Sequence, residues 1–319
     1  MRAGLRRVIQ LVIVVLCVSF FSFFLLQLVP GDPVTSIVGF ASPKDHKIIA
    51  HELHLDQPLV KQYWHWLSGF VHGNLGQVYY GPTGRGKVST LVGQSLPVSL
   101  QLMAYAMILT LLIAVPLGVF AAYRAGTLFD RIANATAFGS IALPDFALAL
   151  VLSYWVGVKL RWVPSSGYVH PTDNLVKHFK TMVLPATSLA VGQIAAYMRL
   201  LRSDMIATLQ EDYILMAKSK GIPNRRVLWR HALRPSSLTT LTVAGLNIGA
   251  LIGGAVVVEV IFGIPGMGQL LFTAIFERQF VEIQSIVALI AIGYVLVNFF
   301  IDLLYSFVDP RIRDARAAL

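Results

Sequence analysis

The chain has 319 residues, of which 56% are hydrophobic and only 13% are charged, and its mean hydropathy is +0.68. A soluble globular domain has roughly 45–50% apolar and about 25% charged residues, so this composition argues against a soluble protein and makes lipid the expected solvent. The formal net charge of +10 could suit a nucleic acid. The basic residues lie between apolar stretches, however, which favours a membrane surface and no nucleic-acid partner.

Six apolar stretches follow one another along the chain. Each is long enough to cross a membrane, which takes about 20 helical residues. Lipid offers backbone groups no hydrogen-bond partners, so spanning segments of this kind must be helical. We therefore predict an all-α integral membrane protein with six transmembrane helices. They lie at about 8–29, 97–122, 133–159, 182–201, 238–262 and 283–308.

The first stretch follows Arg2, Arg6 and Arg7 and carries no charge over 8–29. This apolar core is too long for a signal peptide and no small-residue cleavage site follows it, so we expect a retained anchor. Lys and Arg are more numerous in the segments that share a side of the membrane with the N-terminus. Because the basic side is the cytoplasmic one, both termini are expected in the cytoplasm.

The expected organisation follows from these helices. The parts are the cytoplasmic N-terminus with the first transmembrane helix (1–29), an external loop (30–96), a five-helix transmembrane core (97–308) with a cytoplasmic loop at 202–235, and a cytoplasmic tail (309–319).

Two patterns in the external loop resemble sites of known chemistry. Residues 81–88 nearly match a phosphate-binding loop, but Val88 replaces the hydroxyl residue that would bind magnesium, so a solvated turn is the simpler interpretation. His46, His51 and His54 could form a loose metal site on one helical face, although a solvated helix is again simpler. We predict no metal site and find no catalytic motif.

Three ionisable residues fall inside the apolar stretches: Asp145 in the third, Glu259 near the outer end of the fifth and Asp302 in the sixth. A charge at the centre of a membrane helix costs about 2.5–3.5 kcal/mol on insertion scales, so each needs a partner, a cavity or a polar pathway. For Asp145, beside Pro144, we favour a transport pathway. For Glu259 and Asp302, a hydrogen bond between helices or a position near the interface is the simpler alternative.

The segment between the fourth and fifth stretches predicts two short helices that project from the membrane and meet at a turn. Acidic Glu211 opens the first helix and lysines close it, as the helix dipole favours. Gly221 follows where a left-handed residue commonly ends a helix, and Pro223 suits the first turn of the next. Small Ala217 and Gly221 would let a partner approach closely. The charges for such a contact would come from Arg225, Arg226 and Arg230.

The simpler alternative is an ordinary basic loop that follows the positive-inside tendency. That alternative explains the charge, but it does not explain two helices hinged at one glycine.

Ala217-x-x-x-Gly221, followed by His231-Ala-Leu-Arg, resembles the cytoplasmic coupling loop of permeases in ATP-binding-cassette importers. Within that class the chain resembles the first permease of the dipeptide, oligopeptide and nickel family, and short matching segments are spread over nearly the whole sequence. They include Leu55-Asp-Gln-Pro-Leu59, Gly73-Asn-Leu-Gly76, Pro116-Leu-Gly118, Pro144 with Phe146, Trp162-Val-Pro164, Pro265-Gly-Met-Gly268 and Asp309-Pro-Arg311. The wider importer pattern has Glu-Ala where this chain has Leu215 and Met216.

The resemblance implies the fold of a type I importer permease and a set of partners. Such a permease pairs with a second homologous permease, two ATPase subunits bind ATP and Mg²⁺, and an extracytoplasmic binding protein delivers the substrate. This chain would then be a multi-pass protein of the bacterial plasma (inner) membrane that binds no cofactor and is not itself an enzyme. Di- or oligopeptides are the implied substrates, while nickel and other small solutes stay open.

The resemblance also implies roles for residues. Coupling to the ATPases is expected of Tyr213, Met216, Ala217, Lys218, Lys220, Gly221, Pro223, Arg225, Arg226 and His231. The candidates for the translocation pathway are Asp145, Phe146 and Glu259. Contact with the binding protein is expected of the 30–96 loop and of Pro265, Gly266, Met267 and Gly268.

Two other classes stay open. An ion-coupled secondary transporter could relay protons through Asp145, Glu259 and Asp302, and would need no ATPase. A structural subunit of a larger membrane complex would need no substrate. Co-purification of an ATPase pair discriminates against the first alternative, and loss of solute uptake on deletion of the chain discriminates against the second.

Overall fold

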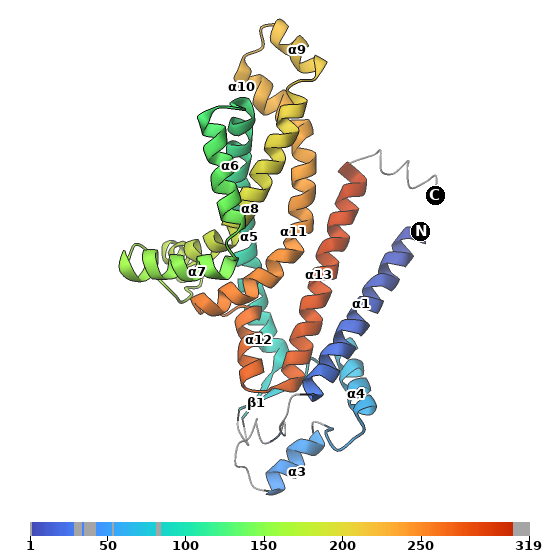
Figure 1. Ribbon diagram of the computed structural model, residues 1–319. Helices are drawn as coiled ribbons and strands as arrows, with labels where there is room; N and C mark the ends of the chain where they lie inside the picture. Colours follow the sequence, from blue (N-terminus) through green and yellow to red (C-terminus); the bar gives the residue numbers. More distant parts are fainter. Residues whose placement is uncertain (1, 29–33, 35–42, 53, 81–83, 309–319) are drawn as a thin grey trace. The chain divides into compact units, whose positions relative to one another are not determined.

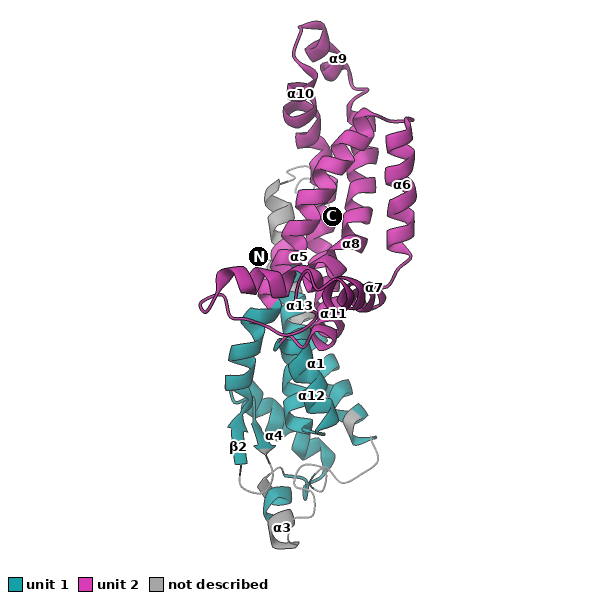
Figure 2. Cartoon of the chain, turned by 90° about the vertical axis from the view of Figure 1, so that its left-hand side faces the viewer, with its two compact units in different colours: residues 1–99, 265–299 teal, residues 100–264, 300–319 magenta. Residues whose placement is uncertain are grey.

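The computed structural model describes residues 2–28, 34, 43–52, 54–80 and 84–308 (Figure 1). The chain divides into two compact units (Figure 2). Unit 1 comprises Met1–Ser99 and Pro265–Phe299, and unit 2 comprises Leu100–Ile264 and Phe300–Leu319. The predicted tail at 309–319 lies outside the described residues.

Helices dominate the described residues, as the composition predicts. The helices long and apolar enough to span a membrane are α5 (Val88–Tyr123), α8 (Leu175–Thr208), a continuous helix over Asn224–Phe262, and α13 (Phe280–Val308) over its Phe280–Ile301 part. They coincide with the second, fourth, fifth and sixth predicted spans. The first predicted span, 8–29, overlaps α1 (Arg2–Gln27), in which Val12–Leu25 forms a shorter apolar helix, and its last residue lies outside the described residues.

The third predicted span is not one straight helix, and the expectation of a continuous helix over 133–159 is wrong. Helix α6 (Leu128–Ile141) ends there, and α7 (Asp145–Leu152), which continues as a π-helical segment over Ser153–Lys159, leaves at an angle of 100°. Pro144 accounts for the break, because it has no N–H to donate and its ψ of 142° is extended. The two helices together form a bent fifth candidate span.

Unit 1 contains a small element that the all-α expectation did not include. Strands β1 (Gln77–Tyr80) and β2 (Gly84–Lys87) form an antiparallel hairpin in which Gln77 lies opposite Lys87. The helices around it are α3 (Pro43–Glu52), α4 (Leu59–Val71), α12 (Met267–Phe276) and the first part of α13. The core under the hairpin consists of Val78, Val88, Val92, Met267, Ala274, Ile283 and Ile286.

Helix α1 packs on α4 in the same unit. Phe23, Tyr63 and Leu67 form a buried cluster, and the hydroxyl groups of Tyr63 and Ser19 lie 3.0 Å apart. An apolar helix therefore contributes its aromatic and hydroxyl side chains to the fold of the predicted external loop, and does not serve as an anchor alone.

A glutamine side chain holds the hairpin to the start of α13. The Tyr79 N–H donates to Gln279 Oε1 at 3.3 Å, and Gln279 Nε2 donates to the Tyr79 carbonyl at 2.7 Å. We expect Gln279→Ala to remove both bonds and to weaken the hairpin by about 1–3 kcal/mol, at roughly 0.5–1.5 kcal/mol for each bond. Hydrogen exchange at the hairpin amides measures this effect. Gln94→Ala, an exposed change in the same unit, should leave that exchange unchanged, and equal protection in both variants would contradict the expectation.

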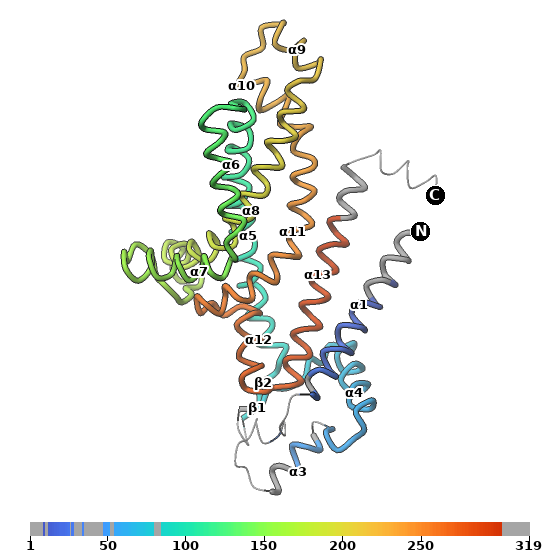
Figure 3. Tube along the Cα trace, viewed as in Figure 1, coloured from blue at the N-terminus to red at the C-terminus, as the bar shows by residue number. Residues whose placement is uncertain are grey.

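Unit 2 is a bundle in which small residues let the helices approach closely. Ala114, Ala121, Ala137, Ala195, Tyr197, Met198 and Ala244 form one buried cluster across α5, α6, α8 and the helix α11 (Leu233–Phe262). A Cβ atom added at Gly118 would lie 3.1 Å from both the Leu201 side chain and the Met198 carbonyl oxygen. Close packing of this kind is common between membrane helices. Lipid provides no hydrophobic driving force for their association, so small side chains that let the backbones approach closely are favoured. Figure 3 shows how α8 runs beside α6 and leads into the predicted cytoplasmic loop.

Candidate functional site

The predicted coupling loop contains a short helix, α9 (Asp212–Ser219), directly after α8. Asp212 lies in its first turn and Lys218 in its last, so the charges complement the helix dipole as predicted.

Gly221 ends α9 in the expected way. Its φ of 76° is left-handed, its N–H donates to the Lys218 carbonyl at 3.0 Å, and the Ile222 N–H donates to the Ala217 carbonyl at 3.2 Å. These two bonds form a Schellman motif, and Ile222 packs on the cluster that contains Ala217, which is the apolar contact that commonly accompanies the motif. A Cβ atom at Gly221 would meet nothing within 4 Å. Backbone conformation, and not space, therefore requires glycine here.

The second predicted short helix does not exist as a separate element. Helix α10 (Asn224–Arg226) starts after Pro223, passes through a π-helical segment over Val227–Ala232 and continues into α11. The sequence offers no stop signal between Pro223 and Pro235. Pro235 itself has no N–H for the regular bond to the residue four positions earlier, His231, which lies in the π-helical segment. The loop is thus one short helix followed by an extension of a spanning helix.

The inner face of α9 packs on the chain's own helices. Ile214 and Ala217 join a buried cluster whose other members are Val119, Ala122, Leu201, Met205, Val227, Leu228 and Ala232. Ala217 is 8% exposed, so its small side chain packs closely against the chain's own helices, and the close approach of a partner here stays a prediction. Asn224 Nδ2 also donates to the Tyr123 hydroxyl at 3.1 Å, which ties the turn to the end of α5. A displacement of α9 would therefore be felt by α5, α8 and α11 together.

The outer face of α9 and of the turn is open. Tyr213, Leu215 and Met216 are 46%, 53% and 58% exposed, which is unusual for three large apolar side chains within one turn. Partial burial, with the nearby charge of Glu211, raises the pKa of the Tyr213 phenol, so it stays a neutral donor at physiological pH. The other predicted coupling residues on this surface are Lys218, Lys220, Gly221, Pro223, Arg225 and Arg226, while His231 is half-buried.

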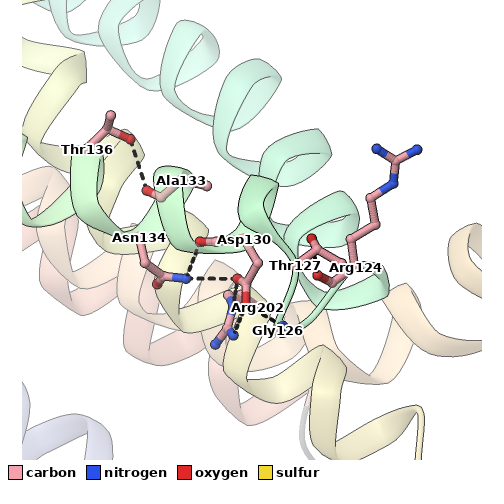
Figure 4. Close-up of polar contacts among 8 residues, drawn as sticks. All are labelled: Arg124, Gly126, Thr127, Asp130, Ala133, Asn134, Thr136 and Arg202. Atoms are coloured by element: carbon pink, nitrogen blue, oxygen red, sulfur yellow. Dashed lines mark hydrogen bonds and ion pairs between the residues drawn. The ribbon is translucent and has the colours of Figure 1, made fainter.

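A buried ion pair joins α6 and α8 at the end of the bundle that carries α9. The sequence did not predict this pair. Arg202 on α8 donates through Nε and Nη2 to the two carboxylate oxygens of Asp130 on α6, and Asn134 Nδ2 and the Gly126 N–H donate to the same carboxylate (Figure 4). The side chain of Asp130 is 5% exposed and that of Arg202 is 24% exposed. The only local signal was a carboxylate in the first turn of an apolar helix, because the two partners lie 72 positions apart.

Asp145, the main candidate for the pathway, is the first residue of α7 and is half-buried where α7 contacts α8 and α11. A Cβ atom added at Gly192 would lie 3.5 Å from Asp145 Oδ1, and one added at Gly254 would lie 3.2 Å from Oδ2. Gly254 on α11 thus makes room for this carboxylate, whereas a Cβ at Gly192 on α8 would make only an ordinary contact. Phe146, beside it, is 50% exposed.

Glu259 is not brought together with Asp145. It lies five residues beyond Gly254 on α11 and is 1% exposed. Five residues turn a helix by about 140° beyond one full turn, so Glu259 points away from the face that meets Asp145. The side chain of Asp302 lies outside the described residues. The described geometry thus offers no direct relay from Asp145 to Glu259.

The predicted contacts with a binding protein are largely internal to unit 1. Gly266, Met267 and Gly268 are buried at the start of α12, and the Met267 N–H donates to the Ser99 hydroxyl at 2.8 Å. Pro265 alone of the four is exposed. The burial of Gly266, Met267 and Gly268 fits a role in anchoring the start of α12, and their contact with a binding protein stays a prediction.

The histidines of the external loop have other contacts. His51 Nδ1 lies 3.0 Å from Asp56 Oδ2, and this hydrogen bond holds the pKa of Asp56 below its usual range. His54 stacks on His65 with ring centroids 4.6 Å apart. No group of three or more His, Cys, Asp or Glu side chains is placed to hold a metal within the described ranges, and the side chain of His46 lies outside them.

Comparison with known proteins covers nearly the whole sequence. Residues 114–314 match the family described as the binding-protein-dependent transport system inner membrane component, and residues 1–95 match its N-terminal membrane component. The chain is 35% identical over 313 residues to the oligopeptide transport system permease protein AppB of Bacillus subtilis, covering 97% of this chain and 98% of that protein. It is 37% identical over 312 residues to a probable peptide ABC transporter permease protein of Sinorhizobium fredii, with the same coverage of both chains.

Proposed function

Because the chain belongs to the family of binding-protein-dependent transport system inner membrane components, we propose that it is a permease subunit of an ATP-driven importer of di- or oligopeptides. The observation that carries the substrate class is the near full-length similarity to proteins named peptide and oligopeptide permeases. Nickel or another small solute is the alternative, and no feature of the described residues favours it.

The chain supplies the membrane pathway, and partner subunits supply the energy. Two ATPase subunits bind and hydrolyse ATP with Mg²⁺, an extracytoplasmic binding protein delivers the peptide, and a second homologous permease completes the pathway. The chain itself has six transmembrane helices with both termini in the cytoplasm, and it binds no cofactor. The outer surface of α9 supports this assignment, because it carries exposed apolar side chains beside basic ones. It therefore offers a cytoplasmic subunit both contact area and charge.

Coupling proceeds through α9. ATP binding draws the ATPases together, and the surface formed by Tyr213, Met216 and the basic turn follows their movement. The buried side chains of Ile214 and Ala217 pass that movement to α5, α8 and α11. The spans then alternate between states open to opposite sides of the membrane, and ATP shifts the balance because it binds one state more tightly.

Reconstitution in liposomes tests the proposal. The chain, its co-purifying permease and ATPases and the binding protein are expected to accumulate a labelled tripeptide only when ATP and Mg²⁺ are on the ATPase side. Replacing the catalytic acid of the ATPase subunits provides the matched control, because it removes hydrolysis and leaves this chain unchanged. Accumulation driven by a proton gradient without ATP would contradict the proposal and favour a secondary transporter.

A further inference from the structure

Two opposite charges in the spanning helices of unit 2 have no counter-charge among the residues that the structure describes. The first is Asp145, whose carboxylate lies against Gly192 and Gly254. It makes no hydrogen bond or ion pair with any other residue that the structure describes. An ionised carboxylate at this depth is costly unless a cation or a donor meets it, so the site calls for a positively charged ligand.

The second charge is Arg199, in the spanning helix α8. Its guanidinium carbon lies 3.8 Å from the centre of the Phe138 ring, a cation–π contact. No carboxylate pairs with it among the residues of known placement. Arg202, one turn further on, has Asp130 as its partner, which makes the unpaired state of Arg199 distinctive. The Phe138 ring covers one face of the guanidinium and leaves its N–H edge for a planar anion.

The two charges share one face of α8. Gly192, which contacts Asp145, and Arg199 are seven residues apart on this helix. Seven residues make two turns, so the two positions point in nearly the same direction and lie about 10 Å apart along the axis. An extended tripeptide spans about 10 Å between its ends, at 3.3–3.6 Å for each residue. The long, flexible arginine side chain extends the range to shorter and longer peptides.

We propose that Asp145 and Arg199 are the two poles of a substrate site in the pathway: Asp145 binds the N-terminal ammonium group of a peptide, and Arg199 binds its C-terminal carboxylate. This inference rests on the proposed function as a peptide permease. It explains why Gly254 lacks a side chain, since a Cβ there would crowd the carboxylate that receives the ammonium group.

The test compares uptake of one tripeptide in three forms, free, N-acetylated and C-amidated, by the complete reconstituted transporter. Arg199→Gln is expected to reduce the preference for the free over the amidated form about tenfold or more, the size of a lost charge-assisted hydrogen bond. Its preference for the free over the acetylated form should stay as in the wild type. Asp145→Asn should show the reverse pattern. The binding protein's own preferences are the same in each case and cancel when variant and wild type are compared.

Lys177→Gln, which removes an exposed cation from the first turn of the same helix, is the matched control and should change neither preference. If Arg199→Gln does not assemble, Phe138→Leu removes only the ring beneath the guanidinium and should weaken the carboxylate preference alone. Variants that keep wild-type preferences, or that slow all three forms equally, would overturn the inference while leaving peptide import in place. Absence of ATP-driven uptake of every form by the wild type would instead overturn the proposed function.

Discussion

A Gly221→Val variant is expected to insert and fold in the membrane but to lose most of its ATP-driven transport. The φ of Gly221 is 76°, which a β-branched residue adopts only with strain. Strain of about 1–3 kcal/mol, equivalent to a factor of about 5 to 150, would favour loss of the Schellman bonds to Lys218 and Ala217 and a changed direction of α9. Uptake in liposomes, normalised to the amount of assembled protein, measures the loss.

Two controls isolate the backbone as the cause. Gly221→Asn should keep most of the transport, because asparagine tolerates the left-handed region. Gly93→Val introduces the same side chain at another glycine where a Cβ meets nothing within 4 Å, but where φ is not positive. It should transport normally. Normal uptake by Gly221→Val at normal expression would rule out the hinge as the element that couples ATP hydrolysis to transport.

The second large effect is expected for Asp130→Ala. This change leaves the guanidinium of Arg202 without its carboxylate in a mostly buried position, which typically costs about 3–5 kcal/mol. It also removes the acceptor of the Gly126 N–H and of Asn134. Thermal unfolding of the detergent-solubilised protein should show a clear loss of stability, concentrated where α6 meets α8.

Removal of both charges provides the decisive comparison. Asp130→Leu combined with Arg202→Met should recover much of the lost stability, because an apolar pair of similar volume avoids burying an unpaired charge. Asp173→Ala, a change at an exposed carboxylate, should have little effect. A double variant as unstable as Asp130→Ala would show that the cost comes from lost shape and not from the unpaired guanidinium.

Local patterns in the sequence predicted the parts of this protein that local physics determines. The apolar stretches are helical, and the acidic first turn and basic last turn of α9 complement its dipole. Gly221 has the left-handed conformation that ends this helix. The break at Pro144 also had a local signal, but the apolar composition on both sides of it favoured one continuous span, and the sequence alone did not show which tendency prevails.

Features that depend on the partner of a side chain could not be predicted. Ala217 and Gly221 are both small, yet only the packed structure shows that Ala217 faces inward. Asp130 and Arg202 meet across 72 positions, and Gln279 meets Tyr79 across 200, so no spacing rule connects either pair. The candidates for the pathway were recognisable as charges in apolar helices. Their directions, which separate Glu259 from Asp145, could be seen only with the helices in place.

We propose that the exposed face of α9 receives the movement of an ATPase subunit. Site-specific photo-cross-linking in cells tests it most directly, with the reactive residue at Met216 on the exposed face or, as the control, at buried Ile214. We expect Met216 to capture a nucleotide-hydrolysing protein, in a yield that changes when ATP is depleted, and Ile214 to capture none. A transporting complex in which Met216 never captures such a protein would contradict the account.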